Sequence, residues 1–152
     1  MDILRALPAN IVATNIYPFA VFVIKDRDHL IEAVDRYCGY ELASDSRRRY
    51  PIGQWDVERV SDFSGVFNAA RNRKLRDFNE DLSSWNVSNG TYFERMFYGC
   101  KLFNSDVSRW NVANATDLRS MFQGCSSFNS DVSGWNVANA TNLRYFFLLQ
   151  FF

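Results

Sequence analysis

The sequence predicts an α/β repeat solenoid: a coil of short strands and short helices, closed at its N-terminal end by a helical cap. Two observations predict this fold. The stretch "FNSDVSRWNV" (103–112) returns as "FNSDVSGWNV" (128–137) and, more loosely, as "FNEDLSSWNV" (78–87), each time 25 residues along the chain. An amphipathic helical pattern precedes these copies. A fixed period of about 20–50 residues is typical of repeats that stack and bury a shared core.

The chain is expected to divide in two. Residues 1–49 hold an N-terminal segment and the helical cap, and residues 50–152 hold about four repeat units, the last one truncated. Five residues make one apolar helix face that ends at Gly39, which suits a cap over the open end of the core; they are Leu30, Ile31, Val34, Tyr37 and Cys38.

Each repeat is expected to contain one strand and one short helix. Trp110 and Val112 are two residues apart, so in a strand their side chains point to the same side. The following residues, 115–125, have apolar side chains at helical spacing. Thr116 is placed to cap this helix through its hydroxyl and Gly124 to end it.

Aromatic residues recur in phase and are expected to form a structural ladder through the core. Stacked units place tryptophan over tryptophan and phenylalanine over phenylalanine, and each buried ring contributes several kcal/mol, at ~25 cal/mol per Å². The residues of this ladder are Trp55, Trp85, Trp110, Trp135, Phe78, Phe103 and Phe128.

Polar residues recur as well. Asp81, Asp106 and Asp131 lie 25 residues apart, where such side chains satisfy backbone groups at tight corners. A stack of calcium sites is the sharper alternative, but one carboxylate per coil supplies few ligands. The polar stretch 70–75 is a five-residue insertion between two units, and we expect it to loop out of the stack.

The last eight residues, "YFFLLQFF" (145–152), contain seven apolar side chains and no charge. An exposed apolar patch of this kind marks an interface or an aggregation risk. We expect this segment to contact another protein or another copy of the chain, while a truncated product with an accidental tail is the competing interpretation. The expected anchors are Phe146, Phe147, Leu148 and Phe151.

Composition argues against several functions. The formal net charge is zero, with 17 basic and 17 acidic residues, so the basic surface that nucleic acid requires is not expected. Residues 7–24 are too interrupted by polar residues for a membrane span. The single histidine, His29, and the three cysteines give no zinc set or catalytic group, so no enzyme, cofactor or metal is expected. An intracellular location is favoured.

The motif "FNxDxSxWNVxNxTxxxxMFxGCxxFN" resembles the BspA-type leucine-rich repeat of bacterial surface proteins. The resemblance covers residues 50 to about 147. It implies a leucine-rich-repeat-like solenoid with a binding or adhesive role rather than catalysis, and it leaves the cell surface open as a location. Two alternatives remain: a structural subunit docked in a larger assembly through its C-terminal end, and an adaptor, because "LPANIVATNIYPF" (7–19) is faintly similar to the opening of an F-box.

Overall fold

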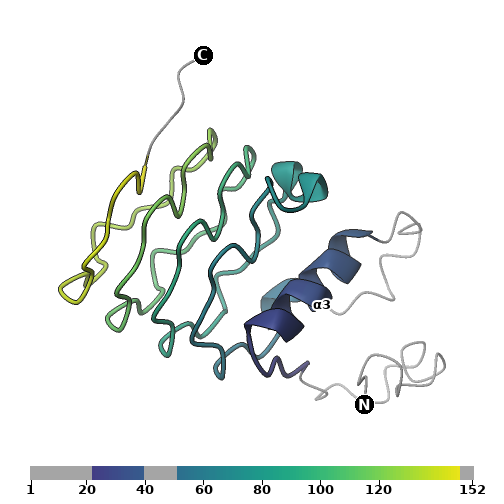
Figure 1. Ribbon diagram of the computed structural model, residues 1–152, viewed down its shortest axis with the longest axis horizontal. Helices are drawn as coiled ribbons and strands as arrows, with labels where there is room; N and C mark the ends of the chain where they lie inside the picture. The colour runs from purple at the N-terminus through teal and green to yellow at the C-terminus, as the bar shows by residue number, and fades with distance from the viewer. Residues whose placement is uncertain (1–21, 40–50, 148–152) are drawn as a thin grey trace.

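The structure is a computed structural model that describes residues 22–39 and 51–147 (Figure 1). The described helices are α3 (Arg27–Gly39) and two 3-10 helices, η2 (Ile52–Gln54) and η3 (Arg73–Asp77). The remaining described chain winds into coils that lie side by side, and α3 lies at the end of the stack where the first coil begins.

Four coils form the stack. A row of isolated parallel bridges crosses them, with one bridged residue in each coil. The bridges join Asp62 to Tyr92, Tyr92 to Asp117, and Asp117 to Asn142. Following the repeat, the coils comprise residues 51–80, 81–105, 106–130 and 131–147. A further parallel bridge, from Val23 to Asp56, ties the segment before α3 to the first coil.

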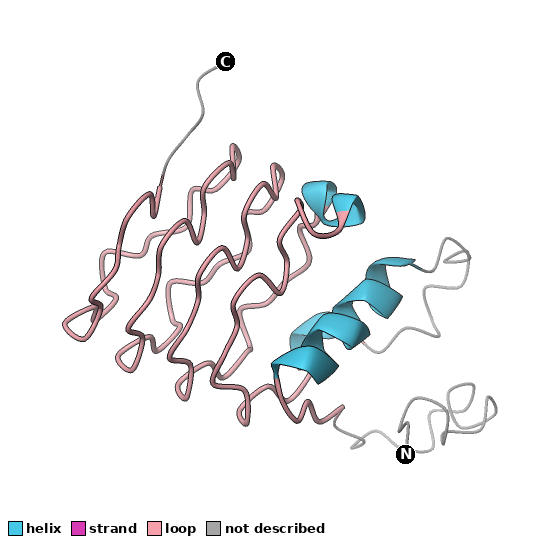
Figure 2. Cartoon of the chain, in the orientation of Figure 1, coloured by secondary structure: helices cyan, strands magenta, loops and turns pink. Residues whose placement is uncertain are grey.

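The expected α/β solenoid of short strands and short helices is wrong. Within residues 51–147 the structure contains no α-helix and no strand, only the two 3-10 helices, isolated bridges and turns (Figure 2). The segment 115–125, expected to be a helix, is a succession of turns, and Thr116 donates its hydroxyl to the carbonyl of Thr91 instead of capping a helix. The expected strand is also replaced by a turn, in which the backbone N–H of Trp110 donates to the carbonyl of Val107.

The backbone of these turns cannot continue as a helix, because each coil has a positive φ at the same repeat position. The values are 53° at Arg95, 54° at Ser120 and 58° at Tyr145, one repeat apart, and Gly65 occupies the same position in the first coil with a φ of 65°. An α-helix needs a negative φ at every residue. Each left-handed residue therefore interrupts helical winding.

Helix α3 begins and ends where its sequence provides the signals. The Asp26 carboxylate accepts the backbone N–H of His29 at 2.9 Å, which caps the first turn, and the helix ends at Gly39. Leu30, Ala33 and Val34 are buried and belong to the same hydrophobic core as the coils. One end of the repeat core is therefore covered by this helix.

Parallel rings run through the core from coil to coil. Phe67, Phe97 and Phe122 form one column, with centroids 5.2 and 5.7 Å apart and interplanar angles of 9° and 2°. Trp85 and Trp110 stack at 6.5 Å and 5°. Aromatic pairs of this kind contribute about 0.5–1.5 kcal/mol each beyond their buried area. Identical residues recur in the sequence because each column repeats one environment.

The insertion at residues 70–75 does not loop out, so that expectation is wrong as well. Its Leu75 is fully buried in the core, and η3 packs against α3. The side-chain amide of Asn72 donates to the Asp35 carboxylate at 2.7 Å, and its oxygen accepts the N–H of Lys74 at the start of η3. The polar residues of the insertion are thus partners of the helix.

Some expectations concern residues that the structure does not describe. The F-box-like stretch (7–19) and most of the apolar segment 7–24 lie outside the described residues. The same holds for two of the expected anchors, Leu148 and Phe151. Among residues 22–39 and 51–147, no helix has the length and apolar character needed to cross a membrane.

Candidate interaction surface

One face of each coil carries a row of backbone hydrogen bonds with a fixed direction. The part of each coil on this face is called its turn segment. The four turn segments comprise residues 63–69, 93–99, 118–124 and 143–147. Alternate N–H groups of one turn segment donate to carbonyls of the next. The N–H groups of Phe93, Arg95 and Phe97, for example, reach the next coil at 2.8, 3.0 and 2.9 Å.

The direction is the same at all three junctions: the earlier turn segment donates and the later one accepts. Between the third and fourth coils, Leu118, Ser120 and Phe122 donate to the carbonyls of residues 142, 144 and 146 at 2.9, 2.9 and 3.2 Å. Within the described residues, the first turn segment therefore has carbonyls with no preceding coil, and the last has N–H groups with no following coil.

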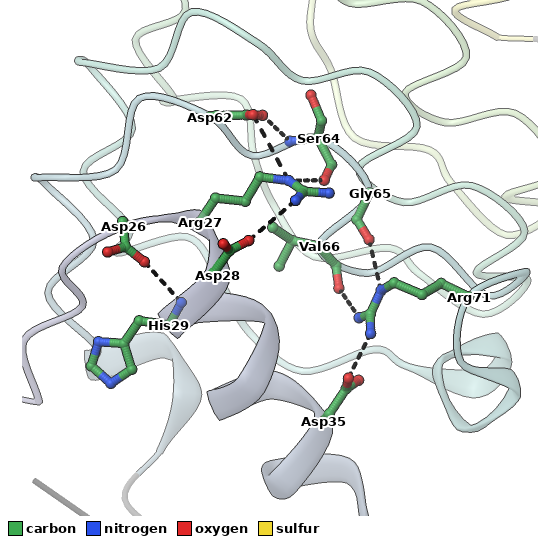
Figure 3. Close-up of polar contacts among 10 residues, drawn as sticks. All are labelled: Asp26, Arg27, Asp28, His29, Asp35, Asp62, Ser64, Gly65, Val66 and Arg71. Carbon is green, nitrogen blue, oxygen red and sulfur yellow. Dashed lines mark hydrogen bonds and ion pairs between the residues drawn. The ribbon is translucent and has the colours of Figure 1, made fainter. Parts of the chain in front are cut away.

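Two guanidinium groups occupy the place of a preceding coil at the first turn segment (Figure 3). The Arg27 Nε donates to the carbonyl of Ser64 at 2.8 Å, and the Arg71 Nη2 donates to the carbonyl of Val66 at 2.7 Å. Ser64 and Val66 stand at the repeat positions whose carbonyls accept from a preceding coil elsewhere in the stack. Arg71 is held in turn by Asp35 of α3 at 2.6 Å. The acceptor end of the stack is therefore capped from within the chain.

Among residues 22–39 and 51–147, nothing caps the donor end of the stack in this way. Within the part of the chain that the structure describes, the backbone N–H groups of Leu143, Tyr145 and Phe147 have no acceptor. Their side chains are exposed as well, at 43%, 47% and 51%. The fourth turn segment thus repeats the geometry of the others but presents its donors and its apolar side chains to solvent.

Phe147 is the outermost ring of a core column. It stacks on Phe122 at 5.9 Å and 13° and on Phe128 at 6.1 Å and 29°. Its counterparts in the two preceding coils, Phe97 and Phe122, are 0% and 1% exposed because another coil covers each of them. Phe147 therefore leaves one side of its ring exposed where a further apolar group would fit.

The two expected anchors that the structure describes differ in exposure. Phe147 lies on the exposed end of the fourth coil, whereas Phe146 is half-buried and packs edge-on against Phe122 and Trp135. Sequence reasoning missed Leu143. The signal was present, since Leu143 stands one repeat after Leu118, which is buried, whereas Leu143 is exposed.

The tryptophans of the expected ladder lie inside the stack. Trp55, Trp85, Trp110 and Trp135 are 3–8% exposed. Three indole N–H groups donate to a carbonyl of the preceding coil: Trp85 to Ile52 at 2.8 Å, Trp110 to Leu82 at 3.1 Å, and Trp135 to Val107 at 3.1 Å. Phe78 and Phe103 are buried and Phe128 is half-buried, and the three form a second stacked column. These residues hold coils together and are not available to a ligand.

The repeated aspartates form turns. Asp81, Asp106 and Asp131 each accept the backbone N–H of the serine two residues later, at 2.9, 3.0 and 2.9 Å. Hydrogen bonds from the hydroxyl and the backbone N–H of Ser108 hold the pKa of Asp106 below its usual value, and the backbone N–H and hydroxyl of Ser83 and Ser133 do the same for Asp81 and Asp131. Among the described residues, no group of three or more His, Cys, Asp or Glu side chains is arranged to hold a metal ion, so the calcium alternative has no support there.

The repeated cysteines are buried and structural. The thiols of Cys100 and Cys125 donate to the carbonyls of Phe67 and Phe97 at 2.8 and 2.9 Å, again across one coil. Burial raises the pKa of Cys125 to about 12 and raises that of Cys100 as well. Because the thiolate is the reactive form, neither side chain is a nucleophile at neutral pH.

Comparison with known proteins gives one match. A family model described as "Mycoplasma protein of unknown function, DUF285" matches residues 40–150, a range that includes all four coils. That family is related to BspA-like repeat proteins, but the leucine-rich-repeat motif itself has no support in a stack of turns. No curated protein and no solved structure matches the chain.

Proposed function

The chain belongs to the DUF285 family, and from its geometry we propose that it is a non-enzymatic protein–protein interaction module whose binding surface is the exposed end of the fourth coil. The observation that carries this proposal is the exposure of Phe147. Its ring is 51% exposed at a position where the two preceding coils bury the same side chain almost completely.

The exposed end has the composition of a protein interface. Leu143, Tyr145 and Phe147 lie at alternate positions of one turn segment and are all exposed, and Arg144 lies between the first two in the sequence. Aromatic residues and arginine are enriched at interfaces, and an apolar patch on an otherwise polar surface marks a binding site.

The polar repeats favour a structural role over catalysis. The aspartate carboxylates accept backbone N–H groups within their own turns. The Nδ1 atom of His29 accepts the backbone N–H of Lys25, beside the start of α3. Groups engaged in this way hold the backbone and are not arranged around a common point where a substrate could react.

Site-specific photo-crosslinking tests the proposal. A photoreactive phenylalanine at position 147 should form crosslinks to another protein in cells that produce the chain. The same group at Leu102, which is 49% exposed but lies outside the turn segments, is the matched control. Crosslinks from position 147 alone support the proposal. Equal crosslinking from both positions, or none from position 147, contradicts it.

A further inference from the structure

The proposed function leaves the chemistry of the partner open. Three features of the fourth coil restrict that chemistry: the direction of the hydrogen bonds between coils, the exposed ring of Phe147, and Arg144, which has no carboxylate partner among the described residues. We propose that the fourth turn segment docks an acidic polypeptide segment of another protein, an inference that rests on the proposed function. That segment presents backbone carbonyls to the N–H groups of Leu143, Tyr145 and Phe147 and packs an apolar side chain on Phe147.

The three junctions between coils show what covers the row of N–H donors along the edge of a turn segment. At each junction, alternate carbonyls of a turn segment accept N–H groups from the coil before it, at 2.7–3.2 Å. At the same junctions an aromatic ring of the later coil stacks on the ring of the earlier one, as Phe122 does on Phe97. A partner segment that supplies both features would reproduce this arrangement on the fourth coil. Adding a segment to an exposed edge is a common mode of peptide recognition.

The charge at this edge favours an acidic partner. Arg119 donates from Nη2 to the Glu94 carboxylate of the preceding coil at 2.6 Å and lies 3.2 Å, through Nε, from Asp117. Arg144 is at the repeat position of Arg119, but the corresponding neighbours are Arg119 and Asn142, which carry no carboxylate. Within the described residues, Arg144 has no carboxylate partner and donates to the hydroxyl of Tyr145 at 2.8 Å. A glutamate or aspartate on the partner, on the side where a following coil would lie, would supply the carboxylate that Arg144 lacks among the described residues.

A second copy of this chain does not fit the edge. In a head-to-tail arrangement the fourth coil would need free carbonyls on the first coil, but those of Ser64 and Val66 already accept from Arg27 and Arg71, and α3 lies at that end. In a tail-to-tail arrangement two rows of N–H donors would face each other. The partner is therefore a chain with an acceptor edge of its own.

Binding of a synthetic peptide to the full chain tests this inference. The probe is NATNLEYFF, which is residues 139–147 with Arg144→Glu, and the matched control is the unchanged peptide NATNLRYFF. Both peptides offer the carbonyls and rings that cover the third coil, but only the first offers a carboxylate to Arg144. We expect the glutamate peptide to bind at least tenfold more tightly at low salt, with a smaller difference at high salt because the ion pair is exposed.

Protein variants and amide exchange locate the bound peptide. Phe147→Ser should weaken binding at least tenfold, Arg144→Ala should remove the preference for the glutamate peptide, and Leu102→Ser should change neither. On binding, exchange of the amide hydrogens of Leu143 and Tyr145 should slow at least tenfold, which a contact through side chains alone would not produce.

Four outcomes would overturn the inference. Binding of neither peptide, or equal binding of both, rules out an acidic segment. Concentration-dependent self-association of the full chain, seen by light scattering, identifies a second copy as the occupant. Binding that occurs only in a chain shortened to end at Phe147 identifies residues 148–152 as the occupant. If crosslinks from position 147 persist while the peptides fail, the proposed function stands and only the inferred partner chemistry is wrong.

Discussion

The indole N–H of Trp110 donates to the backbone carbonyl of Leu82, 28 residues earlier and one coil away, across 3.1 Å. The ring of Trp110 stacks at the same time on Trp85 of that coil. One side chain therefore joins two coils by an apolar contact and by a polar one. The same pair of contacts explains why tryptophan, rather than phenylalanine, recurs at this position.

Replacing Trp110 should separate the two contributions. We expect Trp110→Ala to lower the free energy of unfolding by about 3–5 kcal/mol, the usual cost of a large core truncation. Trp110→Phe keeps most of the apolar contact but leaves the Leu82 carbonyl without its donor, at a cost of about 1–3 kcal/mol. Urea denaturation measures both, with the exposed Arg109→Ala as control. An unchanged midpoint for Trp110→Ala would place the ring on the surface.

The Arg71 cap should matter more than a neighbouring arginine of the same insertion. Arg71→Met keeps the aliphatic stem but loses the donors to Gly65 and Val66 and the ion pair with Asp35. We expect a loss of about 1–2 kcal/mol, near the lower end for hydrogen bonds to charged groups because the side chain is 27% exposed.

The matched control for this cap is Arg73→Met, in an exposed position of η3, with an expected change within about 0.5 kcal/mol. Thermal or urea unfolding compares the two variants directly. Equal losses would show that Arg71 contributes only as an ordinary surface charge.

The repeated aspartates predict a loss of stability in acid. The pKa values of Asp81, Asp106 and Asp131 are lowered in the folded chain by their hydrogen bonds to the following serines. A lowered folded pKa contributes stability above the unfolded pKa, and that stability is lost as the pH falls through the folded pKa. The melting temperature should therefore fall as the pH drops below about 4.

Asparagine at these three positions provides the control, because its amide oxygen still accepts the serine N–H but does not titrate. The melting temperature of the triple Asp→Asn variant should fall less between pH 5 and pH 2.5 than that of the parent chain. Identical pH profiles would assign the acid sensitivity to other carboxylates.

Substitution by alanine should affect stability at one glycine, Gly90, but not at another, Gly134. A Cβ on Gly90 would lie 2.3 Å from the ring of Phe93, whereas a Cβ on Gly134 would meet nothing within 4 Å. We expect Gly90→Ala to destabilise the fold by about 1–3 kcal/mol through overpacking and Gly134→Ala to be nearly neutral. Adding Phe93→Leu should recover stability, because the third coil combines Ala115 with Leu118 at these positions. A neutral Gly90→Ala would mean that the Phe93 ring moves aside at little cost.

The period of the sequence identified which side chains are buried but not the path of the backbone. Apolar residues at Leu118, Met121 and Phe122 have helical spacing, and all three are buried as a helix would require. A run of turns places the same residues inward when Ser120 adopts a positive φ. No local propensity predicts a left-handed serine or arginine. At Arg95 and Ser120 the conformation accompanies a backbone hydrogen bond to the next coil, a contact that local sequence does not encode.

Long-range partners explain the other errors. The insertion was expected to be a surface loop because it is polar and basic, yet Arg71 and Asn72 both pair with Asp35, more than 30 residues earlier. At the C-terminal end the apolar composition drew attention to Phe147, which is exposed; its role as an anchor stays a prediction. The exposed donors and Leu143 became visible only when the direction of the hydrogen bonds between coils was known.

Backbone amide hydrogen exchange in the free, monomeric chain tests most directly the central claim that the stack ends in an open donor row. We predict that the amides of Leu118, Ser120 and Phe122, which donate to the fourth coil, are protected, and that those of Leu143, Tyr145 and Phe147 exchange at least tenfold faster. Equal protection of the two sets would show that part of the chain itself already covers the fourth coil, and would contradict an interaction surface there.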